Sequence, residues 1–263
     1  MLQGNYTAYQ YGFWYIISMS TEPRTAGVII IGDEILSGKV QDSNAFYLSC
    51  ELRKLGVHLL RISVIPDDTG IIGYEAAQFS RHYDFVFTAG GVGPTHDDIT
   101  MEGIAKGFAV KLIRHPRLVD YFRSKYGDPL NNAILKMAEV PEGTEIITFD
   151  DKSFPLVLFR NIYILPGIPE YLRSKFILIK ERFRSPAFYL RRLFLDARES
   201  DIAGILSSVV AENRGVSFGS YPILGNPEYK IIVTAESKSE DALTRAVDEL
   251  VLRLPKAIIV RAE

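Results

Sequence analysis

The sequence is poor in cysteine and in metal-binding patterns. Cys50 is the only cysteine in 263 residues, so the chain forms no internal disulfide and no cysteine-based zinc site. The four histidines also lack the spacing of metal ligands. Because Cys50 falls within an amphipathic helical pattern, we expect it to be a buried, small apolar side chain. Because the chain has no cysteine pair, we expect a reducing, cytoplasmic compartment.

The chain also lacks an excess of positive charge. Its formal net charge is −2, with 47% hydrophobic and 24% charged residues, which is ordinary for a globular protein. Short basic clusters at 180–184 and 191–192 are typical of solvated faces. The apolar run 13–17 is too short to cross a bilayer. We therefore expect neither nucleic acid nor a membrane as a partner.

Residues 1–18 are rich in aromatic side chains but contain no Lys or Arg, unlike a signal or transit peptide. Residues 1–24 are therefore expected to be a flexible extension, of which residues 1–18 are expected to be dispensable. Beyond it, the length suits one medium domain, placed at 25–186, and a small α+β lobe at 187–263.

The first domain is expected to be α/β, with a mainly parallel sheet sandwiched by helices. A continuous apolar run at 26–31 predicts a strand buried on both faces, further strands are expected at 59–65 and 84–89, and helical patterns lie between them. Ser43 is expected to cap the first long helix, and Gly56 to end it. Further helices are expected at 100–108, 116–125, 129–138 and 171–179, with a strand at 162–165.

The second lobe has a different order of elements. Strands are expected at 192–197, 216–222, 229–235 and 257–260, and helices at 199–213 and 240–254. This β-α-β-β-α-β order predicts a ferredoxin-like lobe.

Acidic loops follow each of the first three expected strands. They are Gly32-Asp33-Glu34, Pro66-Asp67-Asp68 and the segment 90–98, GGVGPTHDD. Ligands bind beyond the carboxyl ends of strands in open parallel sheets, so these loops are expected to meet at one site.

Gly90, Gly91 and Gly93 favour binding of an anion, because glycine adopts positive φ and lets backbone N–H groups approach closely. The helix that follows adds the positive end of its dipole, and Thr95 and Thr100 offer hydroxyl donors. The spacing does not match the dinucleotide-binding fingerprint, and no lysine follows as in a Walker loop. A tight structural turn is the alternative explanation for the glycines.

Carboxylates beside a phosphate site repel the ligand unless a divalent cation lies between them or they orient a proton donor. Asp33, Asp67 and Asp98 are the candidates for catalysis, and Asp33 and Asp98 for metal binding. Helix capping by Asp67 or Asp98 is the alternative. His96 is either a proton donor or an exposed side chain.

The three loops together resemble the molybdopterin-binding domain superfamily. The motifs GPTHDD, FPLV at 154–157 and RNIYILPGIPEYLR at 160–173 are most similar to the N-terminal molybdopterin-binding-like domain of eukaryotic FAD synthase. The second lobe also fits this branch, through VSFGSYP at 216–222 and YKIIV at 229–233. The N-terminal domain of the competence/damage-inducible protein A family is a second relative, but its usual Gly-Ala-Pro-Gly loop is replaced by KSFPLVL at 152–158.

The resemblance implies hydrolysis of FAD to FMN and AMP with a divalent metal (Mg²⁺, Mn²⁺ or Co²⁺), and potassium is a further candidate cation. Adenylyl transfer to molybdopterin, cleavage of ADP-ribose and non-catalytic binding of a flavin or pterin nucleotide are the alternatives. The chain contains no segment resembling the synthase domain, so FAD synthesis is not expected of it. A homodimer or homotrimer is expected from the superfamily. The resemblance assigns ligand contacts to one set of residues: Gly90, Gly91, Gly93, Thr88, Thr95, Ser37, Asn44 and Gly167.

Overall fold

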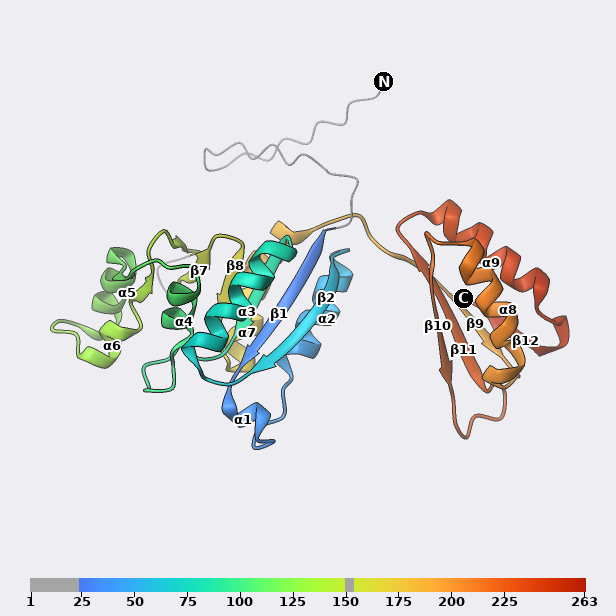
Figure 1. Cartoon of the computed structure of the whole chain (residues 1–263), viewed down its shortest axis with the longest axis horizontal. Coiled ribbons are helices and arrows are strands. Elements are labelled where there is room, and N and C mark those ends of the chain that lie inside the picture. Colours follow the sequence, from blue (N-terminus) through green and yellow to red (C-terminus); the bar gives the residue numbers. More distant parts are fainter. Residues whose placement is uncertain (1–23, 150–153) are drawn as a thin grey trace, which may run out of the picture.

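The computed structural model describes residues 24–149 and 154–263, which form two lobes joined by an extended segment (Figure 1). The expected N-terminal extension lies outside the described residues, apart from Arg24. Each lobe contains its own main sheet.

The sheet of the first lobe has six strands in the order β2-β1-β3-β8-β7-β6. The first four are parallel to one another, and β7 and β6 continue the sheet in antiparallel pairing. The strands span β1 Thr25–Ile31, β2 His58–Ile65, β3 Phe85–Ala89, β6 Glu145–Ile147, β7 Leu156–Phe159 and β8 Ile162–Leu165. The prediction of a mainly parallel sheet is confirmed.

Helices cover both faces of this sheet and enclose two apolar cores. On one face, Leu48 and Leu52 of α2 pack with Phe176 of α7 against β1 and β3. On the other face, the core includes Phe79 of α3 and Ile104 of α4. The helices span α1 Asp33–Leu36, α2 Asn44–Lys54, α3 Thr69–His82, α4 Thr100–Gly107 and α7 Pro169–Ile179, followed by the 3-10 turn η1 Lys180–Phe183.

An excursion from the sheet lies between α4 and β6. It holds a two-stranded ribbon of β4 (Leu112–Arg114) and β5 (Glu139–Pro141), with α5 (Pro116–Tyr126) and α6 (Asn132–Lys136) between the two strands. Leu118 and Phe122 of α5 are buried in the same core as α3 and α4, which anchors the excursion to the sheet.

The second lobe is a four-stranded antiparallel sheet in the order β10-β11-β9-β12. Its chain order is β-α-β-β-α-β, so the ferredoxin-like prediction is confirmed. The elements span β9 Tyr189–Leu195, α8 Glu199–Glu212, β10 Ser217–Pro222, β11 Ile231–Ser237, α9 Glu240–Arg253, η2 Lys256–Ile258 and β12 Ile259–Ala262.

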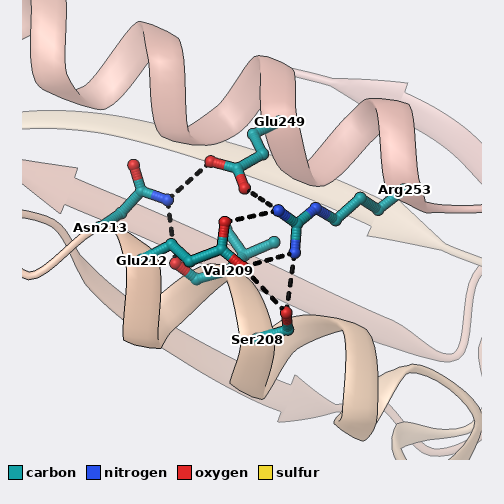
Figure 2. Close-up of polar contacts among 6 residues, drawn as sticks. All are labelled: Ser208, Val209, Glu212, Asn213, Glu249 and Arg253. Carbon is teal, nitrogen blue, oxygen red and sulfur yellow. Dashed lines mark hydrogen bonds and ion pairs between the residues drawn. The ribbon is translucent and has the colours of Figure 1, made fainter.

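One guanidinium joins the two helices of this lobe (Figure 2). Arg253 of α9 donates to both carboxylate oxygens of Glu212 on α8, at 3.0 and 2.6 Å, and to the Ser208 hydroxyl at 2.8 Å. It also pairs with Glu249 on its own helix. The bond with Arg253 is the largest cause that lowers the pKa of Glu212, to about 2.

Contacts between the lobes lie at the end of the first sheet where its parallel strands begin. Arg53 of α2 pairs with Glu236 of β11. Lys238 donates to the carbonyl oxygens of Gly56 and Pro186. The second lobe therefore contacts the end of the first sheet opposite to the acidic loops.

Two local predictions are wrong. Ser43 makes no capping bond to α2; the carboxylate of Asp42 instead accepts the N–H groups of Asn44 at 3.0 Å and Ala45 at 3.1 Å. Asp42 was the better candidate because its two oxygens reach two of the free N–H groups at the helix start. Cys50 is only partly buried, because it lies at the margin of the buried face of α2.

In the described parts of the chain, no helix has the length and apolarity to span a membrane.

Candidate functional site

The acidic loops after β1 and β2 are joined directly. The backbone N–H of Gly32 donates to the carbonyl of Ile65 at 3.1 Å, at the ends of these neighbouring strands. One residue further on, the N–H of Asp33 donates to the carboxylate of Asp67 at 3.0 Å. The ends of β1 and β2 therefore lie side by side as predicted, and the Asp67 side chain hydrogen-bonds to the loop after β1.

Asp67 is partly buried between the first loop and the glycine loop. A Cβ built on Gly91 would lie 3.6 Å from Oδ1 of Asp67, so this oxygen faces the glycine loop. Burial is the largest cause that raises the pKa of Asp67, and the charges of Asp33, Glu34 and Asp97 raise it further. The site at this end thus holds concentrated negative charge.

The capping alternative for Asp67 is wrong, because its neighbour performs that task. The carboxylate of Asp68 accepts the N–H groups of Gly70 at 2.8 Å and Ile71 at 2.9 Å at the start of α3. These two bonds lower the pKa of Asp68. The adjacent carboxylates therefore differ in role, since one caps a helix and the other faces the site.

The first two glycines of the loop are required by their close contacts. Gly90 has φ +114°, and a Cβ there would lie 2.0 Å from the carbonyl oxygen of Ile31. Gly91 has φ +63°, and a Cβ there would lie 2.4 Å from Oγ1 of Thr100. The Thr100 hydroxyl is buried and donates to the Gly90 carbonyl at 2.9 Å. Thr100 therefore stabilises the loop and is not free to bind a ligand, contrary to the sequence prediction.

The far half of the loop folds back on itself. Oδ2 of Asp98 accepts the N–H of Thr95 at 2.8 Å and its hydroxyl at 2.6 Å. A Cβ on Gly93 would lie 2.6 Å from the same oxygen. Asp98 therefore does not cap α4, as the alternative proposed; its carboxylate occupies the anion position at a loop N–H. Asp97 also accepts the Thr95 hydroxyl, and the exposed His96 lies beside Asp97.

A polar contact closes the other side of the site. Nδ2 of the buried Asn44 donates to the carbonyl of Gly167 at 2.7 Å, linking the start of α2 to the turn after β8. A Cβ on Gly167 would lie 3.2 Å from Cα of Gly90, so this turn packs on the glycine loop. Oδ1 of Asn44 is buried and has no hydrogen-bond partner among the described residues. Ser37 is exposed at the end of α1 and donates to the Glu34 carbonyl at 3.3 Å.

Thr88, which the sequence predicts to contact the ligand, lies in the interior of the protein. It is 1% exposed within β3, with Ile29 and Ile164 as neighbours on the adjacent strands. Its hydroxyl is buried without a partner among the described residues. Thr88 lies two residues before Gly90 and points into the protein, so it sits beneath the loop and does not face a ligand.

The donor set is suited to a cation shared with a ligand. Across residues 24–149 and 154–263, no three His, Cys, Asp or Glu side chains lie close enough to enclose a metal by themselves. Mg²⁺ is commonly held by one or two carboxylates together with substrate phosphates and waters. Asp67 and the exposed Asp33 offer such oxygens. Burial raises the pKa of Asp67 most, and the nearby charges of Asp33, Glu34 and Asp97, which raise it further, are ones that a cation would neutralise.

This arrangement coincides with matches to known families. A family described as a probable molybdopterin binding domain matches residues 27–184. The chain belongs to the molybdopterin-binding domain family. The FAD synthase middle domain matches residues 187–263, so both lobes have counterparts in known proteins.

Individual relatives agree with this membership. A protein from Archaeoglobus fulgidus is 34% identical, covering 84% of this chain and 94% of its own length. A probable FAD synthase from Caenorhabditis elegans is 33% identical over 86% of this chain, and the match spans 49% of that protein, about half its length. The solved structure of CinA, a protein of unknown function from Thermoplasma acidophilum, aligns with a TM-score of 0.57 at 30% identity, over 62% of this chain and 99% of that one.

The structure adds one residue to this molybdopterin-binding-type site that sequence patterns missed. Nζ of Lys136, on α6, donates to the carbonyl oxygen of Thr95 in the glycine loop. Lys136 is 41 residues from Thr95 and lies in an ordinary helical stretch, so no local signal marks it. Only the packing of α6 beside the loop reveals it.

Proposed function

We propose that this chain hydrolyses the diphosphate bond of a nucleotide with the help of a divalent metal, and that FAD is the substrate. In this reaction, water attacks one phosphorus, the bridging P–O bond breaks, and FAD and water yield FMN and AMP. The observation that carries the proposal is the Asp33–Asp67 pair against Gly91, where a partly buried carboxylate faces a loop suited to phosphate. The match to the FAD synthase middle domain supports FAD as the substrate.

The loop and the carboxylates have separate tasks in this proposal. Backbone N–H groups at Gly91–Thr95 bind the phosphoryl oxygens, for which the glycines leave room. Asp67 holds the attacking water and accepts its proton, a task that its raised pKa favours. Asp98 releases the Thr95 N–H to the second phosphoryl group and then faces the diphosphate.

Asp33 and Asp67 would hold the metal together with phosphoryl oxygens and water, and the metal would neutralise charge on those oxygens as the bond breaks. Mg²⁺, Mn²⁺ and Co²⁺ are the proposed ions, and potassium is a further candidate.

A second candidate function is adenylyl transfer to molybdopterin, which the family match at residues 27–184 favours. The same loops would bind the same diphosphate, and the two functions differ in whether water or a pterin phosphate is the acceptor.

The test combines a substrate panel with a metal panel. The purified chain is incubated with FAD, ADP-ribose or NADH and with Mg²⁺, Mn²⁺, Co²⁺ or EDTA, with and without K⁺, and AMP release is measured. We expect metal-dependent release that is fastest from FAD and is lost in Asp67→Asn. Nucleotide binding without release under any condition would instead indicate a non-catalytic binding module. Release that persists in Asp98→Ala would contradict the assignment of that residue.

We further propose that the chain acts in the cytoplasm as a homodimer or homotrimer. Light scattering after size-exclusion chromatography gives the mass in solution, and a monomeric mass would contradict this.

A further inference from the structure

Lys136 brings a positive charge to the glycine loop from a distant part of the chain. It is the last residue of α6 and is partly buried, and its ammonium donates to the carbonyl of Thr95. The helix is held in place by Asn131, whose side chain accepts the N–H of Ile134 at 2.9 Å, and by Ile134 and Met137, which pack on the core. The lysine is thus presented to the loop by a fixed element.

The charges around the loop are divided between its two ends. At one end, Asp33, Glu34 and Asp67 lie together, and no positive side chain is among the causes of the pKa shift of Asp67. At the other end, Asp97 and Asp98 bond with Thr95, and the charge of Lys136 is one of the smaller causes that lower the pKa of Asp97, after its bond with Thr95. Both ends of the loop therefore hold carboxylates, and the end at Thr95 also holds the ammonium of Lys136.

We propose that Lys136 is a ligand-binding residue that contacts one phosphoryl group of a nucleotide diphosphate, while the other phosphoryl group lies at the Asp33–Asp67 end. This inference rests on the proposed function for the position of the diphosphate, and adds its orientation. The metal-assisted phosphoryl group is the one beside Asp67, and Lys136 neutralises the other.

Thr95 connects the anion position at its N–H with Lys136. The N–H and carbonyl oxygen of one residue are roughly 3 Å apart, as covalent geometry requires. Thr95 offers its N–H to the anion position now filled by Asp98 and its carbonyl to Lys136. A phosphoryl group that replaces Asp98 at this N–H is then bound to the same residue as the ammonium, within reach of the flexible lysine side chain. An ammonium has three donors, so Lys136 retains donors for the ligand while it contacts Thr95.

The test compares the binding of ADP and adenosine by calorimetry in the wild-type chain and in Lys136→Met, Lys136→Arg and Lys54→Met. Lys54 is the control, because it is also a lysine of the first lobe with a carboxylate partner, Glu51, and it lies at the end of α2 that leads to the start of β2. Thr95 is exposed, so water replaces the lost contact and the Lys136 variants are expected to fold, which circular dichroism checks.

We expect Lys136→Met to weaken ADP binding by roughly 10- to 100-fold, the range of one charge-assisted hydrogen bond, and to leave adenosine binding unchanged. Lys136→Arg should restore part of the ADP affinity, and Lys54→Met should bind like the wild type. Equal losses for ADP and adenosine would show that Lys136 only supports the loop and would overturn the proposal. An ADP affinity within twofold of the wild type, or no ADP binding by the wild type, would also overturn it.

These outcomes are separate from those of the hydrolysis assay. If ADP binding depends on Lys136 but no substrate is cleaved, the proposed function fails and the binding role stands. If FAD is cleaved with wild-type kcat and KM by Lys136→Met, the binding role fails and the proposed function stands.

Discussion

The carboxylate of Asp67 accepts the backbone N–H of Asp33 at 3.0 Å, and this bond joins the loops that follow β2 and β1. Only Oδ2 of Asp67 is used in it, whereas Oδ1 faces Gly91. One oxygen of this side chain thereby joins two loops, and the other faces the glycine loop.

We expect Asp67→Asn to lower kcat for AMP release by about 100-fold or more, because the amide cannot accept a proton from water. The amide oxygen still accepts the N–H of Asp33, so the fold should be retained. Steady-state kinetics with FAD and a thermal melt measure the two effects.

The adjacent Asp68→Asn is the control for this substitution. Asp68 caps α3, and its side-chain hydrogen bonds within the described residues go to Gly70 and Ile71 of that helix, so its variant should keep the wild-type kcat. If both variants lose activity to the same extent, the assignment of Asp67 as the reactive carboxylate is wrong.

Gly91→Ala should remove activity and destabilise the first lobe. Its φ is +63°, which costs an L-residue about 1 kcal/mol or more, and its Cβ would lie 2.4 Å from the hydroxyl oxygen of Thr100. Gly38→Ala is a matched control, because φ is +72° there and no atom lies within 4 Å of its Cβ. Urea denaturation should show a larger loss of stability for Gly91→Ala, and equal losses would contradict the importance of the Thr100 contact.

The buried Lys175 should make stability depend on alkaline pH. It is 9% exposed, its ammonium donates to the carbonyls of Phe154 and Pro155, and burial lowers its pKa from 10.5 to about 8. Between these two values the unfolded chain keeps a proton that the folded chain releases, so stability rises with pH. At about 1.4 kcal/mol per pKa unit, the full effect is roughly 3 kcal/mol.

Urea denaturation from pH 7 to pH 10 measures this effect in the wild type and in Lys175→Met. The free energy of unfolding of the wild type, relative to that of the variant, should increase over this range. A constant difference would show that Lys175 has an ordinary pKa.

The cluster around Arg253 should make the second lobe sensitive to acid. The pKa of Glu212 is lowered to about 2 in the folded protein, so its contribution to stability is complete above the ordinary value of 4.5 and is lost as the pH falls toward 2. Arg253→Met should lower the thermal midpoint at pH 7 and make the midpoint less dependent on pH between 4.5 and 2. Calorimetry of Arg245→Met, which changes an exposed arginine of the same helix, provides the comparison; similar behaviour of both variants would contradict the role of Arg253.

Much of the fold follows from local sequence patterns. Strands β1, β3 and β8 are apolar runs buried on both faces, and their order with the helices predicts a parallel sheet. Strands β6 and β7, at the antiparallel end of the sheet, are not predicted from the sequence, because they are only three and four residues long and no alternation separates them from loop. The positions of acidic loops at one edge also follow from topology, since the carboxyl ends of parallel strands share that edge.

The use of individual side chains was less predictable. Asp42, Asp67 and Asp68 are all acids near a helix start, and the sequence does not show which of them caps a helix. Thr88 looks like part of the glycine motif, yet strand alternation turns it into the core. Lys136 depends on a contact between segments 41 residues apart, for which a single sequence has no signal.

The carboxylate of Asp98 accepts the N–H of Thr95, so it competes with any free anion for this N–H. An internal carboxylate acts at a high effective concentration, so a free anion must displace it before it can use that N–H. Chloride, acetate and single phosphate ions, with one point of attachment each, are poorly matched against it. A diphosphate held at both ends of the loop, as in the proposed function, would regain the lost bond elsewhere, so the Asp98–Thr95 bond would favour it over small single-site anions.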